Sequence, residues 1–160
     1  MTRRWQQNRT LYRRLTVAFL FLVTISMSAL WAEPQGNAGV PAYHSTPPAK
    51  GAKLPPLLTK ADLWNEDAQY PFQTHAYELA GRISSVLYQQ PCYCHCDRMG
   101  HKSLRSCFEG THGAICDICL KELYYSYQQH KGGKTATQIR TGIEQGDWRQ
   151  IDLPSAAEMN

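Results

Sequence analysis

The stretch PCYCHCDRMGHKSLRSCFEGTHGAICDIC, residues 91–119, decides how this chain folds, because it contains all six cysteines of the 160-residue sequence. Three of them lie in Cys92-Tyr93-Cys94-His95-Cys96, where alternate side chains of an extended segment share one side. Two more lie one helical turn apart in Cys116-Asp117-Ile118-Cys119. Cys107 lies on the connection that must fold back between them. We therefore expect the sulfur atoms of both groups to meet in one place.

Three interpretations of these thiols compete. Thiolates prefer Cu(I), Zn(II) and iron–sulfur clusters, and a structural zinc site needs four Cys or His ligands. A small exported domain with six cysteines is instead the usual setting for a disulfide framework. Cys116-x-x-Cys119 at a helix start would also suit thiol redox chemistry, although no strand precedes it.

The spacing favours metal capture, because a disulfide within Cys-x-Cys-x-Cys would close a strained ring. The primary ligands we expect are Cys92, Cys94, Cys96, Cys116 and Cys119, and the secondary ligands are Cys107 and His112. His112 joins the face of Cys116 if that helix begins early. His95 and His101 are further candidates, because neutral imidazole binds the same metals.

The pattern of apolar residues predicts a small, mainly α, Cys-rich domain over residues 65–150. A first helix is expected over 74–90, ended by Pro91, and a second over 114–130. Thr135 and Gln138 form a capping-box pattern for a third helix that ends at about Gln145. One further turn is expected over 103–108, and Asp117 and Glu122 are expected to be solvated helix charges. The first apolar stripe consists of Ala76, Leu79, Ala80, Ile83, Val86 and Leu87.

The N-terminal residues 1–32 have the layout of an export signal or a membrane anchor. Five arginines precede the uncharged run LTVAFLFLVTISMSALWA, residues 15–32, whose 18 residues reach the lower limit for a spanning helix. If the segment is not cleaved, it anchors the chain with its arginines in the cytoplasm. Residues 33–64 are rich in Pro and Gly and predict a disordered linker, and residues 151–160 predict a tail.

The net charge of +4 does not indicate a nucleic-acid partner. Five of the 17 basic residues lie within residues 1–32, where there is no acidic residue, so 12 basic residues face 13 acidic ones in the remainder. A nucleic-acid-binding domain keeps a basic face in its folded part. No nucleic-acid partner is therefore expected.

The motifs also resemble a known family. Pro91-Cys92-Tyr93-Cys94-His95-Cys96, then Gly100-His101-Lys102-Ser103-Leu104, Cys107-Phe108 and Cys116-Asp117-Ile118-Cys119 look like the bacterial PCYCGC-motif proteins, also called the CYCXC (seleno)protein family. The similarity covers residues 77–148, about half the chain, and His95 stands where the family usually has Gly. The resemblance implies export or membrane attachment, often as a lipoprotein, but this chain has no cysteine that could carry the lipid. The function of the family is not established.

Together these features predict an exported protein, periplasmic or otherwise extracytoplasmic, that binds Cu(I) or Zn(II) in metal storage, delivery or homeostasis and is not an enzyme. Its expected partners are the metal ion and, through an uncleaved N-terminal segment, the membrane. The alternatives are an exported thiol–disulfide oxidoreductase and a disulfide-stapled interaction module without chemistry.

Overall fold

The computed structural model describes residues 39–64 and 68–160, which form helices and loops and contain no β-strand. The mainly α fold class is therefore confirmed. The α-helices are α2 (Pro71–Arg82), α3 (Ser84–Leu87), α4 (Asp117–Lys131), α5 (Ala136–Gln145) and α6 (Leu153–Ala156). The 3-10 helices are η2 (Lys60–Asp62), η4 (Cys96–Met99), η5 (Leu104–Phe108), η6 (Thr111–Gly113) and η7 (Asp147–Gln150).

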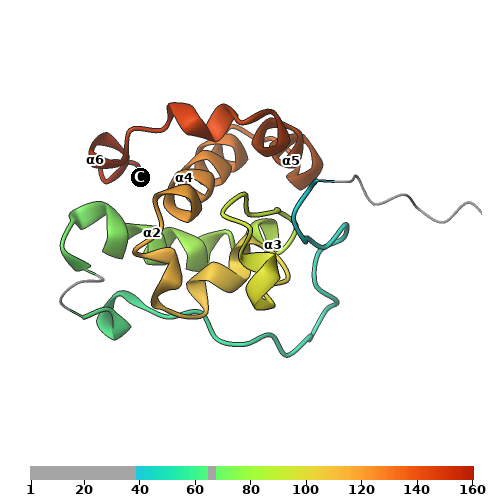
Figure 1. The fold of residues 1–160 in the computed structure, drawn as a ribbon, viewed down its shortest axis with the longest axis horizontal. Coiled ribbons are helices and arrows are strands. Elements are labelled where there is room, and N and C mark those ends of the chain that lie inside the picture. Colours follow the sequence, from blue (N-terminus) through green and yellow to red (C-terminus); the bar gives the residue numbers. More distant parts are fainter. Residues whose placement is uncertain (1–38, 65–67) are drawn as a thin grey trace, which may run out of the picture. The chain divides into compact units, whose positions relative to one another are not determined.

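Helix α4 is the central element of the domain. It packs against α2 and α3 on one side and against α5, η7 and α6 on the other (Figure 1). Leu120, Leu123 and Tyr124 on α4 are fully buried, and the Tyr124 hydroxyl donates a hydrogen bond to the Phe72 carbonyl at 2.7 Å. Because Cys116 and Cys119 lie at the N-terminal end of this helix, the apolar core fixes the position of their sulfurs.

The helix predicted over 74–90 is present as two helices. Helix α2 begins earlier, at Pro71, where the missing N–H costs nothing. The chain leaves helical geometry at Ile83, which has φ −118° and ψ 26°, and α3 follows. The break comes two residues after Gly81, a weak helix former, and before two serines. The predicted apolar stripe is buried throughout, so its assignment to the core is confirmed.

Helix α5 forms as the sequence predicts. Thr135 Oγ1 accepts a hydrogen bond from the Gln138 N–H at 3.3 Å, and Gln138 Oε1 accepts one from the Thr135 N–H at 2.9 Å. Gly146, with φ 83°, ends the helix in the left-handed region that favours glycine. The short turn predicted over 103–108 is likewise present, as η5.

The linker was expected over residues 33–64. Its described part, residues 39–64, is not a free tether, because it lies against the domain. The His44 ring stacks on Tyr88 with 3.8 Å between ring centroids. The buried Arg105 side chain donates a hydrogen bond to the Pro55 carbonyl at 2.7 Å. Prolines lack N–H groups, but their carbonyls still accept hydrogen bonds from side chains of the domain. The compact unit therefore begins at residue 39.

The expected tail, residues 151–160, also belongs to the domain. Asp152 Oδ2 accepts a hydrogen bond from the Ser155 N–H at 3.2 Å and caps α6. Ile151, Leu153 and Ala156 are buried. The prediction ended the domain too early, because these three apolar residues are too few to show a helical period on their own.

The expected signal or anchor, residues 1–32, and the start of the linker, residues 33–38, lie outside the described residues. Within residues 39–64 and 68–160, no helix is long and apolar enough to cross a membrane.

Candidate metal centre

Seven donor atoms, from the six cysteines and His112, gather at the N-terminal end of α4. They form three overlapping groups of four, and within each group all donor atoms lie within 4.8 Å of one another. The inner group is Cys92, Cys94, Cys107 and Cys119; the outer group is Cys94, His112, Cys116 and Cys119; the side group is Cys94, Cys96, Cys107 and His112. Cys94 belongs to all three. The expected convergence of the two cysteine segments is thus present.

The segment from Cys92 to Cys96 reaches this arrangement through a turn, so the extended conformation expected for it is wrong. The His95 N–H donates a hydrogen bond to the Cys92 carbonyl at 3.1 Å, and His95 has φ 57°. Alternate side chains of an extended strand stand roughly 6.6 Å apart. The turn instead brings the Cys92 and Cys94 sulfurs to 3.3 Å.

Cys107 enters the cluster from η5. Its sulfur lies 3.2 Å from that of Cys96, and both residues are buried. The Leu104 N–H donates to the Gln90 carbonyl at 2.8 Å, which attaches η5 to the end of the α2–α3 segment. This backbone contact holds Cys107 beside the other sulfurs.

His112 reaches the cluster without joining helix α4. The helix predicted from residue 114 begins at Asp117, with Cys116 as its N-cap residue. His112 lies in the separate turn η6, and its Nε2 is 3.7 Å from the Cys94 sulfur. Cys119, in the first turn of α4, lies 3.5 Å from the sulfurs of both Cys92 and Cys94.

The other two candidate histidines belong to none of the three groups. His101 Nδ1 lies 3.5 Å from the Cys107 sulfur, and its ring packs edge-on against His112 with 5.5 Å between centroids. His95 turns towards Asp97, at 4.0 Å, and is 42% exposed. His101 therefore borders the cluster, whereas His95 points elsewhere.

Hydrogen bonds between the thiols lower the pKa of some of the cysteines and raise the pKa of others. Hydrogen bonding with Cys107 above all lowers the pKa of both Cys94 and Cys96. The pKa of Cys119 is raised, first by hydrogen bonding with Cys107. The pKa of Cys92 is also raised, again first by Cys107. Cys94 and Cys96 are therefore the sulfurs stabilised as thiolates, and a metal that binds the whole group must displace protons from their neighbours.

Glu122 is a part of the site that the sequence prediction placed wrongly in solvent. Its side chain is fully buried one turn after Cys119, and its Oε1 accepts a hydrogen bond from the Tyr93 N–H at 2.8 Å. Burial raises the pKa of Glu122 to about 8. Its position three residues after Cys119, on the same side of the helix, was the available signal. Glu122 fixes the backbone of the cysteine turn.

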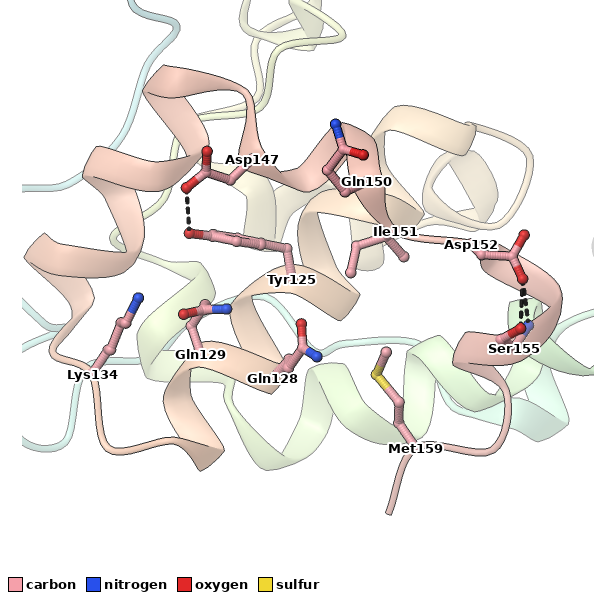
Figure 2. A pocket seen from close by; sticks show the side chains of 10 residues that line it. All are labelled: Tyr125, Gln128, Gln129, Lys134, Asp147, Gln150, Ile151, Asp152, Ser155 and Met159. Carbon is pink, nitrogen blue, oxygen red and sulfur yellow. Dashed lines mark hydrogen bonds between the residues drawn. The ribbon is translucent and has the colours of Figure 1, made fainter.

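A groove on the opposite half of α4 contains none of these donors. It measures about 480 Å³ and lies between the C-terminal half of α4, η7 and the C-terminal segment (Figure 2). The Tyr125 hydroxyl donates to Asp147 at 3.3 Å inside it. Its lining contains neither Cys nor His, so it is separate from the metal centre.

Comparisons with known proteins return no relative. No family model, no curated protein and no solved structure matches the chain. The resemblance to the PCYCGC-motif proteins, which covers residues 77–148, stays a prediction.

Proposed function

We propose that this protein binds a soft transition-metal ion, Cu(I) or Zn(II), through its cysteine cluster. The observation that carries the proposal is the convergence of donors from the cysteine turn, η5, η6 and the start of α4 into groups within 4.8 Å. Sulfur and imidazole donors suit Cu(I) and Zn(II) far better than hard cations such as Mg²⁺ or Ca²⁺.

The sulfur spacing fits a single ion closely. The sulfurs of Cys92, Cys94 and Cys119 form a triangle with sides of 3.3, 3.5 and 3.5 Å. A tetrahedral ion bonded to sulfur at about 2.3 Å holds the ligands about 3.8 Å apart. An outward movement of a few tenths of an ångström brings these three sulfurs to that spacing, and Cys107, whose sulfur lies within 4.8 Å of all three, supplies the fourth ligand.

The proposed place of action is outside the cytoplasmic membrane. The support is the sequence of residues 1–32, with arginines followed by an uncharged apolar run. In that setting, a set of clustered thiol and imidazole donors suits storage, delivery or homeostasis of the metal. The same segment, if uncleaved, is the proposed membrane contact.

The test is metal removal from the whole chain under reducing, oxygen-free conditions. A metal ion that binds only the folded protein, at a free concentration a thousand times its dissociation constant, raises the free energy of unfolding by about 4 kcal/mol. For a domain of this size we expect a chelator to lower the melting temperature by about 10 °C or more. Elemental analysis before and after chelation gives the ion content. Unchanged melting together with no retained ion would exclude the metal site.

The thiol–disulfide oxidoreductase stays the competing proposal, with Cys116 and Cys119 as its reactive pair. Such an enzyme needs an accessible thiol with a lowered pKa. Here Cys119 is buried, and the pKa of Cys116 is raised despite a hydrogen bond with Cys119. Reduction of a peptide disulfide by the reduced, metal-free protein at a rate above that of free cysteine would favour the enzyme.

A further inference from the structure

We infer that the cluster is a two-metal centre in which Cys94 and Cys119 bridge an inner and an outer ion; the inference rests on the proposed metal-binding function. The inner and outer groups share these two cysteines and no other residue. Each group then adds two donors of its own. Cys92 and Cys107 complete the inner site, whereas His112 and Cys116 complete the outer site.

The two shared sulfurs are correctly spaced for bridging. Cys94 Sγ and Cys119 Sγ lie 3.5 Å apart. Two ions at about 2.3 Å from both sulfurs would therefore lie about 3 Å from each other, on opposite sides of the line that joins the sulfurs. That separation lies just below the roughly 3.5–4 Å that is typical of two-metal sites in proteins.

The balance of charge also favours a second ion. Four thiolates around a single divalent ion leave excess negative charge in a buried environment, which is costly. The outer ion brings its positive charge together with only one further thiolate, Cys116, and a neutral imidazole, His112. A second divalent ion therefore lowers the uncompensated charge of the whole cluster, whereas a second Cu(I) ion, whose single charge matches the one added thiolate, leaves it unchanged.

The two sites differ in their access to solvent. Cys92, Cys107 and Cys119 are 2% exposed or less, while Cys116 and His112 are only half-buried. An ion in the outer site can exchange with a ligand in solution without disturbing the core. Three of the four inner ligands are buried and only Cys94 is half-buried, so we expect the inner ion to leave last.

The experiment compares the whole chain with a variant that lacks the outer donors. The reduced, oxygen-free protein is loaded separately with Zn(II) and with Cu(I), bound ions are counted by native mass spectrometry, and X-ray absorption at the metal edge measures metal–metal scattering. The variant carries His112→Gln and Cys116→Ser. His95→Gln is the matched control, since this histidine lies outside all three groups.

We expect the wild type and the control to hold at least two ions with metal–metal scattering near 3 Å. The double variant should hold one ion and lose that scattering. A single ion in the saturated wild type, or two ions without metal–metal scattering, overturns the inference but keeps the proposed function. No retained ion of either metal overturns both.

Discussion

The two ends of helix α4 differ in what they offer to a ligand. The N-terminal end carries Cys116 and Cys119 into a tightly packed set of sulfurs. The C-terminal half lines an open groove of about 480 Å³ with amide, hydroxyl and carboxylate groups (Figure 2). The first has convergent donors and little empty space, whereas the second has space and no convergent donors.

The difference shows that the groups able to hold a metal ion lie away from the groove. A metal ion needs only the volume between its ligands, so its site need not appear as a cavity. A groove lined by polar side chains on one helix and two short turns offers water the same hydrogen bonds that it offers a ligand. The four predictions that follow test whether the two ends are independent.

Cys94→Ser should have the largest effect, because Cys94 belongs to all three donor groups. A hydroxyl is a poor ligand for soft metals. We expect the affinity for Cu(I) and Zn(II) to fall by at least about 100-fold. This is more than the loss that follows when a residue hydrogen-bonded to a metal ligand is replaced. Competition with a coloured chelator measures it. Asp147→Asn, in the groove, is the control and should leave the affinity unchanged; an equal loss in both variants would refute the independence of the two ends.

The second prediction concerns pH and Glu122. The pKa of Glu122 is raised to about 8 in the folded protein from its ordinary value of 4.5, so the unfolded chain releases this proton at lower pH. The metal-free, reduced domain should therefore lose stability as pH rises from about 4.5 to about 8, by up to about 1.4 kcal/mol per pH unit from this group. Glu122→Gln should flatten that part of the profile in urea unfolding. A wild-type slope retained in the variant would show that Glu122 does not cause it.

The third prediction compares the two ends of α4 through substitutions of glycine. A Cβ at Gly113 would lie 2.7 Å from the Cys107 carbonyl oxygen, a backbone atom that cannot easily yield. Gly113→Ala should cost about 1–3 kcal/mol and also weaken metal binding, because it pushes η6, which carries His112, away from η5. Urea unfolding and chelator competition measure the two effects.

Two other glycines provide the controls for this test. A Cβ at Gly110 meets no atom within 4 Å, so Gly110→Ala should change neither stability nor affinity. A Cβ at Gly142 would collide with the Tyr125 hydroxyl on the groove side. Gly142→Ala should destabilise the domain and leave the metal affinity of the folded protein as it is. Loss of metal affinity in Gly142→Ala would mean that the two ends are coupled.

Thr135→Ala should have the smallest effect. It removes the N-cap hydrogen bond to the Gln138 N–H of α5, which is worth about 1 kcal/mol. We expect a small decrease in the urea midpoint and an unchanged number of bound ions. A change in ion content would show that α5 contributes to the metal centre.

The helices and their core could be predicted from the sequence where apolar residues recur over several helical turns or where a capping motif marks the start of a helix. The stripe from Ala76 to Leu87 and the Thr135–Gln138 cap are such cases. The short α6 and the attached segment before residue 65 could not be predicted in this way. Their order depends on contacts such as the Arg105 hydrogen bond to the Pro55 carbonyl, between residues 50 positions apart.

The sequence by itself determined which donor atoms this protein offers: all six cysteines fall within 28 residues, and sulfur prefers soft metals whatever the fold. Only the tertiary structure decided which of these donors lie close together. The turn at His95, the separate turn that carries His112 and the buried Glu122 each depend on long-range contacts. These contacts set the distances between sulfurs, and the distances determine which cysteines can share an ion.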